Sequence, residues 1–433
     1  MTLGWLGGRT FASLRHRNFR LYYASHAVAF AGRWMQQIAA YWLVLELTGS
    51  AVAVGLLALV QLLPVTLFGL AAGSVVDRFD IRRTIVICES VMAVLAGLLA
   101  ALTIAGVIET WMVYVLIGAQ GLFLVVDNPA RHALVFRIVG PSDLPNAVAL
   151  SSGLGTMARV AGPALGGLVV AVAGTGVAFA VNAVSYLAVV VAVLAIRESE
   201  LIATASGQAG VGVVSGMRDT LRFAFASHRV AVAFLGVLVV STVSFNFDVL
   251  FPLLAAQTLD AGAGTFGLIA AIFGAGALLG AMTLATIGKA RMRLMLLGAG
   301  GFGLLELALA PQTSLAVVCA LLVPLGVFYV LWGSSALATL QLAAPAHLRG
   351  RAVSLYFFAF QGGAPVGGLL AGWLTTVGGT RLAFAVAGTV ALGVAAAGAL
   401  VLRRAQTLSP QADATTSAAA SAARAMSSSS TSR

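Results

Sequence analysis

The chain has 433 residues, of which 60% are hydrophobic and only 9% are charged, and its mean hydropathy is +1.01. So little charge over this length excludes a water-soluble domain and predicts an all-α polytopic membrane protein. The formal net charge of +11 would suit a nucleic-acid-binding protein, but the basic residues lie in separate short segments between apolar runs, which indicates membrane topology instead.

A membrane-spanning helix needs about 20 consecutive apolar residues. Charged residues and Gly/Pro breaks divide this chain into about twelve apolar segments of that length, so we predict twelve transmembrane helices. The best delimited of these segments are 19–47, 53–76, 84–105, 110–136, 176–196, 230–256 and 265–287.

Lysine and arginine occur in every second segment between these helices. They lie before residue 19 and in 78–83, 131–137, 197–229, 289–293, 349–351 and 403–404, whereas the alternate segments contain none apart from Arg381. Because cytoplasmic loops carry the positive charge, this pattern predicts cytoplasmic termini and an even number of crossings. Residues 1–20 hold four arginines and no long apolar core, so we expect no cleaved signal peptide.

Composition divides the chain into five parts. We expect a cytoplasmic N-terminus (1–18), a first helical bundle (19–196), a cytoplasmic linker with a short amphipathic helix near 218–226 (197–229), a second bundle (230–403) and a disordered, Ser/Ala/Thr-rich cytoplasmic tail (404–433). The two bundles are related, because a pattern of proline, leucine and Ala-Val in 141–150 recurs in 345–355. Internal repeats of this kind are expected of a transporter.

Charge is concentrated between the second and third expected helices, at Asp77, Arg78, Arg82 and Arg83, and Gly73 precedes these residues. The glycine lets the two helix ends approach closely. The arginines hold the turn in the cytoplasm, and Asp77 is placed to pair with an arginine or with the positive end of a neighbouring helix. We interpret these residues as a latch on a cytoplasmic gate.

Asp127 and Arg131 lie one helical turn apart near the end of the fourth expected helix, so they can pair. Their depth matches that of Asp77, which predicts that they join the latch network. Glu89, near the inner face of the third expected helix, is placed to join it as well.

Six polar side chains within apolar helices are candidates for a cavity that binds substrate or protons: His26, Arg33, Gln37, Arg159, Asn246 and Asp248. The first three share one face of the first expected helix. Arg33 lies near the middle of that span, where a charge costs about 2.5–3.5 kcal/mol. It must therefore face a partner charge or a water-filled cavity.

The fifth expected helix contains a helix-packing kink formed by Gly162, Pro163, Gly166 and Gly167. A Gly-Pro step followed by small residues lets a helix bend and pack closely against another. The run 362–368 in the second half has a similar pattern.

Several of these stretches resemble the major facilitator superfamily. Residues 73–83 resemble its signature loop G-x-x-x-D-R-x-G-R-R, with Asp80 in place of the glycine and Ile81 in place of the first basic residue. Arg33 stands where relatives have Ser or Thr, and Gly162 begins only a partial match to the glycine motif of drug/proton antiporters. The resemblance to the enterobactin-exporter-like branch rests on 17–21, 32–37, 42–44, 47–50, 127–131, 143–147, 182–186 and 348–351.

This resemblance implies the major facilitator fold, with twelve transmembrane helices in two pseudo-symmetric six-helix bundles around a central cavity. In the family, the loop aspartate is thought to latch the cytoplasmic gate. Members are mostly proton-coupled exporters of siderophores, macrolides or other drugs in bacterial inner membranes. The resemblance therefore implies a monomer in that lipid bilayer, a small-molecule substrate, the proton gradient as energy source, and no cofactor.

In such a cavity, Asp248 would take and release a proton while Arg33 and Arg159 attract an anionic or polar group of the substrate. Alternatively, Arg33 and Asp248 form a static salt bridge between the halves. A facilitator, a lipid flippase or an importer of the same fold stays open, as does a transport-inactive sensor or partner. We expect no enzyme, catalytic residue or metal site, because the sequence lacks nucleophile, phosphate-loop and metal-ligand patterns, and Cys88 and Cys319 lie in apolar segments.

Overall fold

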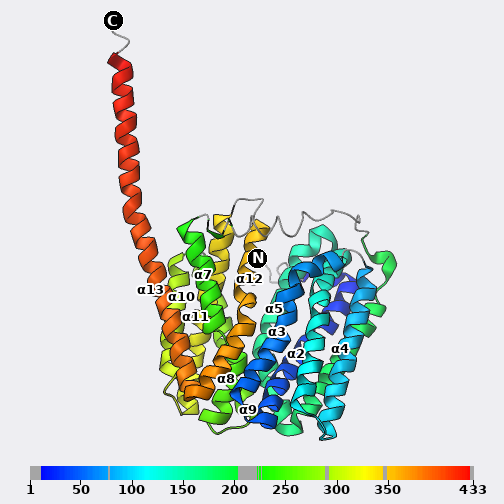
Figure 1. The fold of residues 1–433 in the computed structure, drawn as a ribbon. Coiled ribbons are helices and arrows are strands. Elements are labelled where there is room, and N and C mark those ends of the chain that lie inside the picture. Colours follow the sequence, from blue (N-terminus) through cyan, green and yellow to red (C-terminus); the bar gives the residue numbers. More distant parts are fainter. Residues whose placement is uncertain are drawn as a thin grey trace, which may run out of the picture.

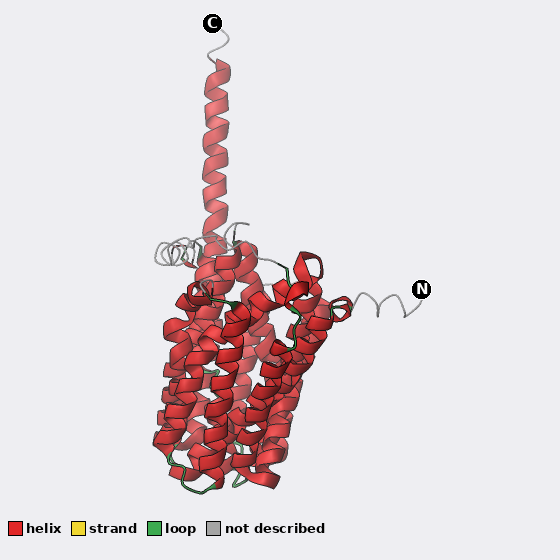
Figure 2. Ribbon diagram, turned by 90° about the vertical axis from the view of Figure 1, so that its right-hand side faces the viewer, coloured by secondary structure: helices red, strands yellow, loops and turns green. Residues whose placement is uncertain are grey.

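The computed structural model describes residues 11–76, 79–202, 222, 224–225, 227–287, 292–344 and 349–429, and within these residues the fold is helical without a strand. Figure 1 shows long helices that run side by side as two bundles, and both Figure 1 and Figure 2 show a single helix projecting from one end. Residues 197–202 lie at that same end, which we call the linker end, and the opposite end is the hairpin end.

The first bundle begins with a short 3-10 helix, η1. Its elements are η1 (Ala12–Arg15), α2 (Arg17–Thr48), α3 (Ala51–Val76), α4 (Ile81–Ile104) and α5 (Thr110–Leu194), followed by η2 (Glu198–Glu200). The second bundle contains α7 (His228–Val243), α8 (Phe247–Leu253), the π-helical turn η3 (Leu254–Thr258), α9 (Ala263–Ile287), α10 (Met292–Leu309), α11 (Leu315–Ala343), α12 (Arg349–Gly362) and α13 (Ala364–Ser429).

Glycines interrupt the two longest helices. In α5 the backbone leaves the helical region at Gly140 (φ 71°) and Gly174 (φ 84°), and in α13 it does so at Gly378 and Gly379, the latter with φ 68°. A left-handed φ is readily adopted by glycine and disfavoured for other residues, so each break reverses the chain within a few residues. Such breaks let successive helices pack antiparallel without a long loop.

Among the described residues, eight helices are long and apolar enough to cross a membrane. This number counts α5 once, although Gly140 and Gly174 divide it. It also counts residues 352–404 once, although Gly378 and Gly379 interrupt the helix there. The first expected crossing, α2, is not among the eight. Arg33, Gln36 and Gln37 lie at its middle, which lowers its hydropathy.

Close backbone contacts join the two bundles in two places. At the first, a Cβ on Gly167 of α5 would lie 2.5 Å from Gly267 Cα of α9. At the second, a Cβ on Gly55 of α3 would lie 2.5 Å from the carbonyl oxygen of Gly368 in α13. Both α3 and α9 begin at the hairpin end, so these contacts, which we call the glycine seams, close that end of the molecule.

The linker end of the first bundle is tied together by polar contacts. Ser13 donates to Asn146 Oδ1 from its backbone N (2.9 Å) and its hydroxyl (2.6 Å), and Asn18 exchanges two 3.1 Å hydrogen bonds with the backbone of Arg197. The Asn146 side chain thus fixes η1 against the part of α5 that follows Gly140.

The tail differs from the sequence-based expectation. We predicted disorder from residue 404, but α13 continues as a helix to Ser429 and extends away from the bundles (Figures 1 and 2). The segment is rich in alanine, the residue with the highest helix propensity, which favours continuation of the helix. Most of the amphipathic helix expected near 218–226 lies outside the described residues.

Candidate functional site

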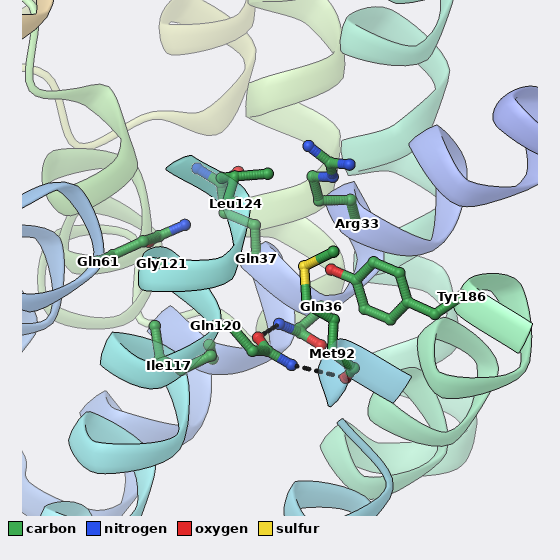
Figure 3. A pocket seen from close by; sticks show the side chains of 11 residues that line it. Arg33, Gln36, Gln37, Gln61, Met92, Ile117, Gln120, Gly121, Leu124 and Tyr186 are labelled. Atoms are coloured by element: carbon green, nitrogen blue, oxygen red, sulfur yellow. Dashed lines mark hydrogen bonds between the residues drawn. The ribbon is translucent and has the colours of Figure 1, made fainter. Parts of the chain in front are cut away.

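A polar pocket lies between α2, α3, α4 and α5 in the middle of the first bundle (Figure 3). It contains about 480 Å³ of space outside the protein atoms, part of it open to solvent. Arg33 and Gln37 both line it, as their shared helix face predicted. The Arg33 guanidinium also lies over the ring of Phe30, 5.7 Å from its centroid, on the same face of α2.

Buried amide groups form one wall of this pocket. Gln36 donates to Gln120 Oε1 (2.5 Å), Asn182 donates to Gln36 Oε1 (2.6 Å), and Gln120 donates to the carbonyl oxygen of Met92 (3.3 Å). Figure 3 shows the two glutamines side by side, joined by the Gln36–Gln120 hydrogen bond. The sequence analysis did not single out Gln120, although a lone glutamine within an apolar run is a detectable signal. This amide network connects α2 and α4 with both ends of α5.

Asp248 and Arg159 lie between the two bundles, and both are exposed. The Asp248 side chain in α8 is hydrogen-bonded to Gln37 of α2 and faces the charge of Arg159. Arg159 of α5 in turn donates from Nη1 to the hydroxyl of Tyr329 in α11 (3.3 Å). A charge within a membrane-spanning bundle needs a partner or a polar cavity, so Asp248 and Arg159 are candidates for a polar cavity between the halves.

The alternative of a static salt bridge between Arg33 and Asp248 does not fit this arrangement. No ion pair joins these two side chains, both of which are described. The polar partner of Asp248 is Gln37, and the cation facing it is Arg159.

An aromatic cluster in the second bundle borders the same junction. Phe245 stacks on Tyr329 with ring centroids 4.6 Å apart and planes within 6° of parallel. The cluster continues through Phe247, Phe251, Phe273, Phe302, Trp332, Tyr356 and Phe360. Tyr329 therefore carries both an apolar stacking surface and a hydroxyl that touches Arg159.

Asn246, predicted in the cavity, has a structural position instead. It occupies the break between α7 and α8, where its Nδ2 donates to the carbonyl oxygen of Thr242 (2.8 Å). It is buried, and a Cβ on Gly367 would lie 2.7 Å from its Oδ1. The single helix expected over 230–256 is thus interrupted at Asn246, whose side chain replaces part of the lost backbone hydrogen bonding.

His26, Glu89, Asp127 and Arg131 form a second group of charges, which we call the buried charge cluster. Arg131 Nε donates to Asp127 Oδ2 (2.6 Å), the pair expected from their spacing, and Arg131 also pairs with Glu89 of α4 and with Nδ1 of His26. His26, predicted among the cavity residues, lies against Arg131 of this cluster. The side chains of Glu89 and Asp127 are 0% exposed and that of Arg131 is 5% exposed.

The other expected latch residues are placed differently. Arg82 donates to the carbonyl oxygens of Val193 (3.0 Å) and Leu194 (2.5 Å) and pairs with Glu198, so it binds the end of α5 instead of Asp127. The backbone N of Arg83 donates to Oδ1 of Asp80, which caps α4. Asp77 and Arg78 lie outside the described residues, and Gly73 is described only as part of α3.

The expected kink in the fifth helix is a packing surface without a break. The backbone stays helical from Gly162 to Gly167, and the breaks in α5 lie at Gly140 and Gly174 instead. A Cβ on Gly162 would lie 2.4 Å from Trp34 Cβ, and one on Gly166 would lie 3.0 Å from Met35 Cα, both in α2. The Pro163 carbonyl and Gly167 face α9 across the seam.

Comparisons with known proteins agree with this architecture. The model of a family described as transmembrane secretion effector matches residues 8–427. The chain is 23% identical over 387 residues to macrolide efflux protein A of Streptococcus pyogenes, covering 87% of this chain and 94% of that protein. It is 22% identical over 273 residues to the staphyloferrin A transporter of Staphylococcus aureus, covering 62% of this chain and 67% of that one.

The fold is similar to that of a solved transporter. The crystal structure of the nucleoside transporter NupG superposes with a TM-score of 0.72 over 89% of this chain and 99% of that chain, at 13% sequence identity. Identity this low supports the shared fold alone.

Proposed function

The chain belongs to the transmembrane secretion effector family of the major facilitator superfamily, and we propose that it is a proton-coupled exporter of an amphipathic small molecule that works by alternating access. Its relatives include siderophore and macrolide transporters, which supports a small-molecule substrate and export. Its family and relatives are transporters and not enzymes.

We propose twelve membrane crossings in two six-helix bundles. Gly140 and Gly174 divide α5 into three crossings. We count α7 and α8 together as one crossing. We count α12 with the part of α13 before Gly378–Gly379 as another, and the part of α13 after these glycines as the last. The basic residues gather at the linker end, which supports a bacterial inner membrane protein with both termini in the cytoplasm. One chain supplies both bundles of the proposed cavity, which supports a monomer.

The observation that carries the proposal is the exposure of Asp248 and Arg159 between bundles whose glycine seams are closed at the hairpin end. With the linker end in the cytoplasm, the closed seams at the hairpin end support an inward-facing cavity. Alternating access then requires the seams to part while the linker end closes. Small residues favour this, because backbone-to-backbone contacts can separate without moving side chains.

In this cavity, the substrate and a proton compete for Asp248. The charged carboxylate accepts a strong hydrogen bond from a donor group of the substrate, whereas a protonated one accepts weakly. Arg33 and Arg159 attract an anionic or polar acceptor group, and Phe245 with Tyr329 offers a surface for the apolar part. Competition for one carboxylate is the exchange that an antiporter needs.

The test uses inside-out membrane vesicles that contain the chain, with erythromycin as the probe. A proton gradient, acidic inside, should drive erythromycin uptake that a protonophore abolishes. Asp248→Asn should lose this uptake, while the matched change Asp260→Asn in the exposed turn before α9 should keep it. Uptake in the wild type that persists after the gradient is collapsed would indicate a facilitator and contradict the proposal.

A further inference from the structure

The buried charge cluster contains more negative than positive charge. Three helices bring its members together: His26 from α2, Glu89 from α4, and Asp127 with Arg131 from α5. A guanidinium can only donate hydrogen bonds, so His26 Nδ1, which touches Arg131, must be the acceptor and the ring is neutral. Two carboxylates therefore share one guanidinium.

The two carboxylates also have unsatisfied oxygen atoms. Oε2 of Glu89 and Oδ1 of Asp127 are buried without a hydrogen-bond partner. A buried charge without a partner is strongly destabilising, and a group in that position binds a proton instead. One proton on either carboxylate removes the excess charge and leaves the ion pair with Arg131 intact.

Other titratable groups face the cluster, and none of them forms an ion pair with Glu89 or Asp127. They are Tyr22 and Arg33 of α2, His132 and Tyr186 of α5, and Cys88 of α4. Arg33 is half-buried at the pocket, lies over Phe30, and forms no ion pair with Glu89 or Asp127, both of which are described along with it. It acts on Asp127 only through space.

Glu306 shows why the cluster is distinctive. This glutamate in α10 is also 0% exposed, and neither of its oxygens has a hydrogen-bond partner. No cation pairs with it among the described residues, so it keeps its proton throughout. In the cluster, Arg131 stabilises the charged form and burial stabilises the neutral form, so the proton can exchange.

We propose that Glu89 and Asp127 share one exchangeable proton, which makes the cluster a second proton-binding site separate from Asp248. His26 is the half-buried member of the cluster, so a proton would enter on its side, bind one carboxylate oxygen and leave by the same route. When the proton leaves, Arg131 holds both carboxylates and ties α4 more tightly to α5. The transport readout of this inference rests on the proposed function.

The first test measures protonation directly by infrared spectroscopy of the reconstituted chain at neutral pH. The wild type should show a protonated-carboxyl C=O band that is missing in Glu89→Gln or Asp127→Asn and that titrates away at higher pH. Arg33→Gln should move that titration to higher pH, because a nearby cation favours the charged form. Glu306→Gln should remove a band that does not titrate. If neither cluster variant changes the carboxyl bands, the inference is overturned.

The second test separates proton coupling from substrate movement in proteoliposomes with erythromycin as the probe. Glu89→Gln should lose accumulation driven by a pH gradient and keep exchange at equal pH, and Glu306→Gln should keep both. If purified Glu89→Gln is not monodisperse, Asp127→Asn replaces it in both assays, with the same expected result. If both cluster variants accumulate erythromycin like the wild type while Asp248→Asn does not, the second site is refuted and the proposed function stands. A wild type without gradient-driven accumulation refutes the proposed function, and the infrared result then decides the inference alone.

Discussion

Gly167 of α5 and Gly267 of α9 meet backbone to backbone across the two bundles, so closely that a Cβ on Gly167 would lie 2.5 Å from Gly267 Cα. The same relationship recurs between Gly55 and Gly368 in the other seam. These contacts allow the hairpin end to close, because any larger residue would hold the helices apart.

The seam predicts a defined effect of Gly167→Ala. The added methyl group would force α5 and α9 apart, so the closed hairpin end should be destabilised and gradient-driven erythromycin uptake should fall. Gly153→Ala in the same helix, where a Cβ meets nothing within 4 Å, is the matched control and should gain about 0.5–1 kcal/mol of helix stability without losing uptake. Equal uptake by the two variants would contradict the role of the seam.

The buried amide network predicts a loss of stability in Gln36→Ala. This change leaves Gln120 Oε1 and Asn182 Nδ2 without the hydrogen bonds that Gln36 makes to them, which should cost about 1–3 kcal/mol and lower the melting temperature in detergent. Gln61 lines the same pocket but lies outside this network, so Gln61→Ala should lower the melting temperature much less. Similar melting temperatures would show that water replaces the lost hydrogen bonds.

Tyr329 predicts separable contributions to substrate binding. Tyr329→Phe removes the hydroxyl that accepts from Arg159 Nη1 and keeps the stacking on Phe245. One lost hydrogen bond to a charged group is worth about 1.5–3 kcal/mol, so erythromycin affinity should fall by roughly tenfold to a hundredfold if Arg159 needs that contact. Tyr329→Ala should reduce it further, because the aromatic surface is lost as well. Fluorescence or calorimetric measurement of erythromycin binding to the purified chain tests both changes. If Tyr329→Phe binds erythromycin as tightly as the wild type, the Tyr329 hydroxyl does not position Arg159 for binding.

Glu306 predicts a stabilising substitution. Because its neutral carboxyl has no hydrogen-bond partner in the fully buried interior, Glu306→Leu should leave uptake unchanged and be neutral or stabilising by about 1–3 kcal/mol. Thermal unfolding at neutral pH measures the change. A loss of uptake at wild-type stability would reveal a functional role for this residue.

The sequence predicts local relationships well and distant ones poorly. Asp127 and Arg131 are four residues apart on one helix, so their pairing follows from helical geometry alone. Gln36 and Gln120 are 84 residues apart, and their contact depends on how α2 packs against α5. The alternative of an Arg33–Asp248 salt bridge fails for the same reason, because the packing of the two bundles decides which polar side chains come together.

Helix boundaries followed from hydrophobic length, whereas breaks within apolar segments did not. The expected segments 84–105 and 265–287 agree closely with α4 and α9. The interruption at Asn246 was missed, because a single asparagine in an apolar run is also compatible with a continuous helix. Glycine is equally ambiguous, since Gly174 breaks α5 and Gly167 packs within it.

The most direct test of alternating access is the distance between the two bundles at the hairpin end. Spin labels on Val107→Cys, in the α4–α5 turn, and on Thr313→Cys, in the α10–α11 turn, would report it in a chain whose Cys88 and Cys319 are replaced by alanine. Pulsed electron resonance should give one short distance for the closed seams and a second, longer one whose population changes with pH and with erythromycin. A single distance that is the same under every condition would contradict the account.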